Sequence, residues 1–215
     1  MESYFLLFLL VFIISLILLT DCSGQENFEA SFEKAAGKMT DDPSVPSLIP
    51  HIAADGTVRK VQGGFSNPGK AANKLSEIDA NLQKLVSYIK NKFPSHAVTQ
   101  NLAKRYNGQN IFEGVPNNEQ SLTSYTTNKE VMGFCLRKKN TPSNVYNDLN
   151  LIMFVAIHEL AHMGSFTIGH GSEFWRNFRW LLERAIEIGI YRAVNYSVRP
   201  VEYCGLKVDY NPLFS

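Results

Sequence analysis

The chain has 215 residues and nearly balanced charge, with 21 lysines and arginines against 20 aspartates and glutamates. This length fits one folded domain with additional segments. The net charge of +1 excludes the strongly basic footprint of a dedicated nucleic-acid binder, so no nucleic-acid partner is expected. Hydrophobic residues make up 45% of the chain, which is enough to form a buried core.

An apolar run, YFLLFLLVFIISLILL, occupies residues 4–19. It is slightly shorter than the roughly 20 residues that span a bilayer. It is also at or just beyond the upper end of a signal-peptide core, about 7–15 residues, and the preceding Met-Glu-Ser lacks basic residues. We therefore expect residues 1–20 to contain an uncleaved hydrophobic helix that anchors the chain in a membrane. Secretion after removal of a signal sequence is the alternative.

Residues 21–70 show no sustained helical or strand period. Prolines and glycines interrupt this stretch repeatedly, which predicts a flexible tether. The pattern changes after Pro68, so we expect the folded domain at residues 71–215. The interrupting residues are Pro43, Pro46, Pro50 and Pro68, and Gly37, Gly56, Gly63, Gly64 and Gly69.

Two amphipathic helices open the predicted domain. Apolar residues recur at three- and four-residue steps over residues 75–89, which predicts a helix that ends before Pro94. Ser95 is the predicted cap of a second helix, which Asn107-Gly108 closes. The apolar stripes consist of Leu75, Ile78, Leu82, Leu85 and Ile89 in the first helix, and of Val98, Leu102 and Tyr106 in the second.

A hairpin and two further helices follow. Residues 121–127 and 130–138 have the composition of two strands joined near Asn128. A third helix is predicted to begin at Asn147 or Asp148 and to run to about Met163. A fourth begins at Ser172, ends at Gly189 and buries the stripe Phe174, Phe178, Leu181, Leu182 and Ala185. The order of these elements predicts an α+β fold.

The segment His158-Glu159-Leu160-Ala161-His162 lies on the third predicted helix. Residues four apart face the same side of a helix, with Cβ atoms about 5–6 Å apart. Two imidazoles placed in this way can each reach one metal ion at about 2.0–2.1 Å. Glu159 is rotated away from that line, toward the open position of the metal. There it can take a proton from bound water, whose pKa zinc lowers to about 7. The segment therefore predicts a Zn²⁺ site with a catalytic glutamate.

A catalytic zinc needs a third protein ligand. His170 lies eight residues after His162 between two glycines that let the chain fold back, and we predict that it is this ligand. Glu173 competes for the position, but its place in the first turn of a helix is favourable without any metal. His51 and His96 are interpreted as ordinary surface residues.

The segment HELAHMGSFTIGHGSEFW is similar to the signature of the WLM and SprT-like minimal zinc metallopeptidases. These enzymes pair HExxH with a third histidine and a following acidic-aromatic stretch, here Glu173-Phe174-Trp175. A looser similarity extends over residues 73–205 and includes Gly133-Phe134-Cys135-Leu136-Arg137. The combination of apolar anchor, tether and WLM-like domain also resembles proteins encoded by large DNA viruses. This resemblance implies that the anchor lies in a viral or a host membrane.

This resemblance implies a zincin-like minimal metalloprotease domain, with zinc on His158, His162 and His170 and Glu159 as the general base. It also implies a protein or peptide substrate that pairs with a strand beside the cleft. Several relatives act on proteins bound or crosslinked to DNA. The anchor at residues 4–19 and the lack of a basic segment favour a different substrate here.

We therefore expect a membrane-tethered zinc metallopeptidase. The alternative is a non-catalytic membrane or virion structural protein that keeps the fold around a structural zinc, and a zinc amidase is a third interpretation. Glu159 discriminates between catalysis and structure, because a structural site closes its fourth position and has no use for a neighbouring carboxylate.

A second donor often stabilises the oxyanion in such enzymes. The candidates are Tyr191, Tyr196, Tyr203, Arg137 and Arg199, each of which also has a purely structural interpretation.

Two further sequence features have meaning only if the domain faces an oxidising space. Cys135 and Cys204 could pair in that setting, but their spacing alone does not show that they do. Asn195-Tyr196-Ser197 is a glycosylation sequon.

Overall fold

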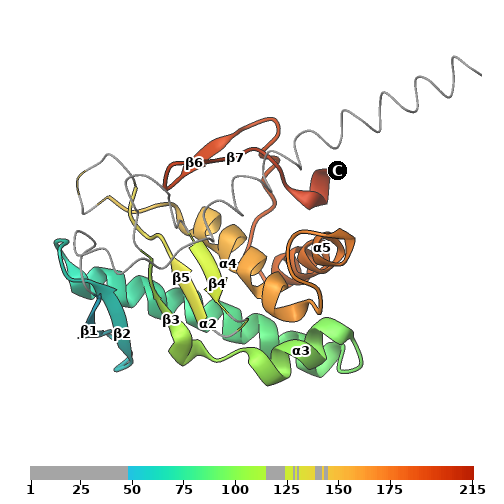
Figure 1. Cartoon of the computed structure of the whole chain (residues 1–215), viewed down its shortest axis with the longest axis horizontal. Helices are drawn as coiled ribbons and strands as arrows, with labels where there is room; N and C mark the ends of the chain where they lie inside the picture. Colours follow the sequence, from blue (N-terminus) through green and yellow to red (C-terminus); the bar gives the residue numbers. More distant parts are fainter. Residues whose placement is uncertain (1–47, 115–123, 128, 130, 139–141, 143–144) are drawn as a thin grey trace, which may run out of the picture.

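The computed structural model describes residues 48–114, 124–127, 129, 131–138, 142 and 145–215. Within these residues, helices pack against a small mixed sheet (Figure 1), and the predicted α+β class is confirmed. The apolar run at residues 4–19 lies outside the described residues. None of the described helices has the length and apolarity needed to cross a membrane.

The sheet has the strand order β1-β2-β3-β5-β4. Its strands are β1 (Leu48–Ile52), β2 (Val58–Gln62), β3 (Ile111–Glu113), β4 (Ser124–Thr127) and β5 (Val131–Phe134). The pairs β1–β2 and β4–β5 are antiparallel, whereas β3 runs parallel to both of its neighbours. The predicted hairpin is thus confirmed as β4–β5, and β4 forms one outer edge of the sheet.

The predicted tether is wrong from residue 48 onward. Strands β1 and β2 belong to the sheet and contact the helix that follows them, so this hairpin is part of the folded domain. The strand pattern was hidden because β2 buries a charged residue, Arg59, whereas its neighbour Val58 is exposed. Pro50 is tolerated because β1 is an edge strand.

A buried ion pair makes the position of Arg59 favourable. The Arg59 guanidinium lies 2.6 Å from the Asp79 carboxylate and also donates to the hydroxyl of Ser76 and the carbonyl of Gly108. Tyr106 donates its hydroxyl to the same carboxylate at 2.6 Å. Every charged group of this pair therefore has hydrogen-bond partners, as burial requires.

Among the described residues, four α-helices carry the core. They are α2 (Pro68–Lys92), α3 (Ala97–Arg105), α4 (Leu149–Gly164) and α5 (Ser172–Glu187). The apolar stripes predicted for α2 and α5 are buried. The cap of α3 is His96, one residue after the predicted Ser95, and the cap of α5 is Gly171, one residue before the predicted Ser172. Gly189 follows the end of α5, as predicted, and adopts a left-handed conformation.

Helix α4 lies at the centre of the domain. Its cap Asp148 accepts hydrogen bonds from the backbone N–H groups of Asn150 and Leu151. Figure 1 shows α4 between the strands β4 and β5 and helix α5, and it also contacts α2 and α3. Every residue from Leu151 to Ala161 is buried. Side chains on α4 are therefore held by packing on all sides.

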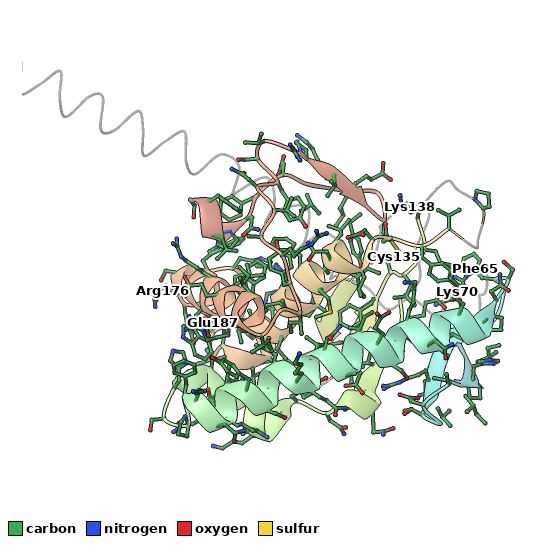
Figure 2. All side chains as sticks on the ribbon, turned by 180° about the vertical axis from the view of Figure 1, so that it is seen from behind. Phe65, Lys70, Cys135, Lys138, Arg176 and Glu187 are labelled. Atoms are coloured by element: carbon green, nitrogen blue, oxygen red, sulfur yellow. A yellow bond between two sulfur atoms is a disulfide. The ribbon has the colours of Figure 1, made fainter. Side chains whose placement is uncertain are left out.

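The C-terminal segment is attached to the sheet by a disulfide. Cys204 lies between β6 (Val201–Tyr203) and β7 (Leu206–Val208) and is bonded to Cys135, directly after β5. Figure 2 labels Cys135 on the side of the domain where this C-terminal hairpin lies, whereas Arg176 and Glu187 lie at the opposite end. Asn147 donates from its side-chain amide to the carbonyls of Cys135 and Arg137.

We predict that reduction of this disulfide destabilises the domain. The bond closes a loop across a sequence separation of 69 residues, so its loss should lower the free energy of unfolding by about 2–4 kcal/mol. Urea unfolding with and without a phosphine reductant measures this difference. The variant Cys204→Ala should be insensitive to the reductant. Identical midpoints for the wild type in both conditions would contradict the prediction.

Candidate metal centre

The three predicted histidine ligands lie together. His158 and His162 are one turn apart on α4, and His170 is in the loop between α4 and α5. The Nε2 atom of His158 lies 3.2 Å from the Nε2 atoms of both His162 and His170. One ligand atom from each ring lies within 4.8 Å of the others, so the three residues could hold a metal ion.

The spacing of these nitrogen atoms fits a metal better than it fits mutual hydrogen bonds. Two nitrogen ligands of a tetrahedral zinc at about 2.0–2.1 Å are about 3.3–3.4 Å apart, close to the distances from His158. A ring nitrogen carries either one proton or one lone pair. The Nε2 atom of His158 therefore cannot form a full hydrogen bond with both neighbours at once. A shared cation satisfies all three rings.

An aromatic side chain packs against all three imidazoles. The ring centroid of Phe174 lies 4.8 Å from that of His158, 4.3 Å from that of His162 and 4.7 Å from that of His170. The ring centroid of Phe178 lies 5.2 Å from that of His158. The sequence analysis placed both phenylalanines in the buried stripe of α5 but missed this contact. Their i,i+4 spacing was the available signal, because it puts both rings on one face of the helix.

The surroundings keep the buried imidazoles neutral. Burial lowers the pKa of His158 well below its usual value, and His162 and His170 lower it further. Burial also lowers the pKa of His162 to about 3, with smaller effects of His170 and Lys129. Metal binding requires neutral imidazoles. Both α4 histidines are thus in the protonation state that a metal needs at neutral pH.

Glu159 is buried beside the first histidine, with 2% of its surface exposed. It follows His158 directly and precedes His162 by three residues on the same helix. Burying a carboxylate costs free energy unless the site provides compensation. Glu159 thus lies in the buried part of α4 next to two side chains that could hold a metal ion, which is where a general base at such a site would lie.

Glu173 lies outside the histidine cluster. Its carboxylate accepts hydrogen bonds from the N–H groups of Phe166 at 2.8 Å and Thr167 at 2.9 Å, and from the Thr167 hydroxyl at 2.6 Å. These bonds, the Thr167 hydroxyl first, lower the pKa of Glu173 to about 2. Among the described residues, the cluster of potential ligands contains the three histidines and no carboxylate.

The other two histidines are also elsewhere. His51 is in β1, and His96 stacks on Trp180 with ring centroids 3.9 Å apart. Both are half-buried, and neither belongs to the histidine cluster.

Most of the proposed oxyanion donors have structural roles. The rings of Tyr191 and Tyr196 pack against Phe154, and Asn211 donates its side-chain amide to the Tyr191 hydroxyl. Burial raises the pKa of both tyrosines. Arg137 forms a buried ion pair with Glu113 at 2.7 Å, Tyr203 is buried in β6, and Arg199 is exposed in the turn before β6.

The chain is similar to proteins of large DNA viruses. It is 32% identical over 148 residues to the uncharacterized protein R325 of Acanthamoeba polyphaga mimivirus, which covers 66% of this chain and 73% of that protein. The chain therefore belongs to the family of viral proteins that includes R325.

Two iridescent-virus proteins are also similar. The chain is 32% identical over 86 residues to the uncharacterized protein 136R of Invertebrate iridescent virus 6, and 38% identical over 100 residues to the uncharacterized protein 042R of Invertebrate iridescent virus 3. These matches cover 40% and 46% of this chain, and 47% and 60% of those two proteins. No protein-family model and no solved structure matches the chain.

We predict one tightly bound metal ion per chain, identified as zinc by elemental analysis of the purified full-length protein. His170→Ala should weaken binding by at least the roughly 10–100-fold that loss of an outer-shell partner costs, because it removes a direct ligand. His51→Ala is the matched control and should bind like the wild type. Equal metal content and affinity in both variants would contradict the assignment of His170.

We also predict that the metal-free protein loses stability as the pH falls from about 6.5 toward 3. The unfolded chain binds a proton at His162 below about pH 6.5, whereas the folded chain resists it, so acid favours unfolding. The contribution of His162 alone is about 2 kcal/mol between pH 7 and pH 5. Urea unfolding across this range measures it, and His162→Gln should show a shallower dependence. Equal slopes would contradict the prediction.

Proposed function

We propose that the chain is a zinc-dependent metallopeptidase with a zincin-like domain. His158, His162 and His170 would hold the zinc, and Glu159 would act as the general base. The observation that carries this proposal is the convergence of three imidazole nitrogens beside a buried glutamate on one central helix. The resemblance of HELAHMGSFTIGHGSEFW to the WLM and SprT-like metallopeptidases supports the same assignment.

The ligand set favours zinc over the other common divalent ions. Three neutral imidazoles suit zinc, whereas magnesium and calcium prefer oxygen ligands. Three protein ligands also leave one position open, as catalytic zinc sites do and structural sites do not. When bound, zinc would lower the pKa of a water molecule to about 7 and polarise the scissile carbonyl. The donor set of this chain therefore fits a hydrolytic zinc.

The chain's own residues supply the remaining chemistry. Glu159 takes the proton of the attacking water and passes it to the departing amine, so that one carboxylate serves as base and then as acid. Phe174 and Phe178 fix the imidazole rings and limit water around His158. Burial of the histidines keeps protons from competing with the metal at neutral pH.

The sheet edge next to α4 suggests how a substrate binds. Within the described residues, strand β4 pairs with β5 and lies at the edge of the sheet, and it contacts α4. An extended peptide can add to such an edge through main-chain hydrogen bonds. A peptide on β4 would run close to the helix that carries His158 and His162. The substrate class that fits this arrangement is an extended or unfolded polypeptide.

The cellular setting is part of the proposal. We propose that residues 4–19 tether the enzyme to a viral or host membrane. The Cys135–Cys204 disulfide favours a domain on the oxidising side of that membrane, because such bonds persist there. Similarity to proteins of mimivirus and of iridescent viruses fits this setting. The net charge of +1 gives no reason to propose a nucleic-acid partner.

The test is Glu159→Gln in the full-length protein. Glutamine matches glutamate in size but accepts no proton at neutral pH, so hydrolysis of unfolded casein should fall by about 10²–10⁴. Zinc content and thermal melting should stay close to those of the wild type. Glu183→Gln, which changes a half-exposed residue on α5, is the control and should keep full activity.

Two outcomes would contradict this proposal. Equal cleavage by Glu159→Gln and wild type, above a chelator-treated blank, would exclude the base role of Glu159. Zinc binding without cleavage of any unfolded protein or peptide library by the wild type would favour a structural zinc. In that case Glu159→Gln should be silent or stabilising, because it removes a buried charge.

A further inference from the structure

A lysine from the β4–β5 hairpin reaches the loop that carries His170. Lys129 lies between β4 and β5, and its ammonium group donates to the carbonyls of Ser165 at 2.6 Å, Phe166 at 2.9 Å and Thr167 at 3.0 Å. These three carbonyls follow the end of α4 directly. One cation therefore satisfies three successive backbone acceptors, which is the full donor capacity of a lysine.

The same stretch of backbone is held from its other side by an anion. The Glu173 carboxylate accepts from the N–H groups of Phe166 and Thr167 and from the Thr167 hydroxyl. The ammonium thus binds the carbonyls of residues 165–167, and the carboxylate binds N–H groups of residues 166 and 167. Charge-assisted hydrogen bonds of this kind are roughly twice as strong as neutral ones. Below, "the loop clamp" means Lys129 and Glu173 with these bonds.

Helix α3 secures the end of α4 independently of the loop clamp. Arg105 donates to the carbonyls of Met163 at 2.7 Å and Ser165 at 2.9 Å, and Asn101 donates to that of Gly164 at 2.8 Å. These contacts fix the last turn of the helix, where His162 lies. Beyond Ser165, the backbone groups of Phe166 and Thr167 are bound by the loop clamp.

Hydrophobic burial does not order this loop. The two large apolar side chains of the loop point outward, with 66% of Phe166 and 92% of Ile168 exposed. An exposed loop of this kind is ordinarily mobile, because burial contributes little to its order. The polar contacts of the loop clamp must therefore offset the conformational entropy that fixing the loop costs.

The backbone of Lys129 provides an independent indication. Its φ of +59° lies in the left-handed region, which glycine and asparagine favour. A lysine at such a position costs roughly 1 kcal/mol relative to glycine. The chain accepts this cost at the position from which an ammonium reaches the loop. The contacts of the ammonium group, and not the shape of the turn, explain why a lysine occupies this position.

We propose that Lys129, together with Glu173, is a positioning residue that holds the 165–170 loop so that His170 faces His158 before any metal binds. The proposal rests on the metal site of the proposed function but not on peptidase activity. Without the loop clamp, metal binding would have to order the loop first. The affinity would fall by the order of 10–100-fold that outer-shell changes cost at metal sites.

The experiment compares Lys129→Met, Lys129→Gly and Lys129→Arg in the full-length protein. Zinc affinity is measured by chelator competition, and the ligand geometry is followed by the visible absorption of the cobalt-substituted protein. Lys129→Met and Lys129→Gly should both bind zinc 10–100-fold more weakly and lose intensity in the tetrahedral cobalt bands. Lys129→Arg should restore most of the affinity, because a guanidinium can also donate to several carbonyls.

The two weakening variants separate positioning from general stability. Lys129→Gly relieves the left-handed backbone, so it should unfold at a higher urea concentration than Lys129→Met in the metal-free state and still bind zinc weakly. Lys104→Met, which changes an exposed lysine of α3, is the control and should resemble the wild type. Wild-type zinc affinity in Lys129→Gly would overturn the proposal, since the ammonium would then be dispensable.

Hydrogen exchange tests the loop clamp without any metal. In the metal-free wild type, the amide protons of Phe166 and Thr167 should exchange slowly. Both Lys129→Met and Glu173→Gln should raise their exchange rates at least tenfold. Unchanged protection in both variants would overturn the proposal. If the wild type binds no zinc but the mutations still remove this protection, the loop clamp exists and the proposed metal site does not. Failure of the loop clamp and failure of the metal site therefore give different results.

Discussion

Three imidazoles that face one another at the edge of a protein core, one of them buried and two half-buried, are unfavourable unless something binds their nitrogens, and this constraint governs the arrangement of the site. Each ring loses solvation on burial. Two of them lie on α4, where His158 is fully buried and His162 is half-buried, so that His158 cannot turn toward water without disturbing the core. The low pKa values of His158 and His162 express the same constraint, because a proton is the competitor that burial excludes. Phe174 then restricts all three rings to directions that converge.

The site holds its histidine side chains in two different ways. Apolar packing fixes His158 and His162, because α4 contacts both the sheet and the neighbouring helices. Polar contacts fix the approach to His170, because the loop exposes its large apolar side chains and binds Lys129 and Glu173 through its backbone. A rigid helix with a separately held loop suits a site whose side chains must be in position before an ion binds. The exposed Phe166 and Ile168 also leave an apolar surface four and two residues before His170 in the chain.

The sequence predicted the features that depend on local spacing. Helical periodicity located the buried stripes of α2 and α5, and the spacing of His158, His162 and His170 located the cluster. The sequence did not predict the features that depend on contacts between residues far apart in the chain. Strand β2 was missed because Arg59 occupies an inward position that the distant Asp79, Ser76 and Gly108 make favourable. Lys129 was missed because its acceptors lie 36 to 38 residues away, so no local pattern pointed to the loop clamp.

These two ways of holding the ligands respond differently to conditions. Apolar packing around α4 is insensitive to salt, whereas the ammonium and carboxylate of the loop clamp are partly solvent-exposed and therefore screened. High ionic strength should loosen the loop before it loosens the helix. The disulfide lies elsewhere, between the segment after β5 and the C-terminal hairpin, and contributes through the unfolded chain. Stability of the fold and readiness of the metal site are therefore separate properties of this molecule, because different interactions maintain them.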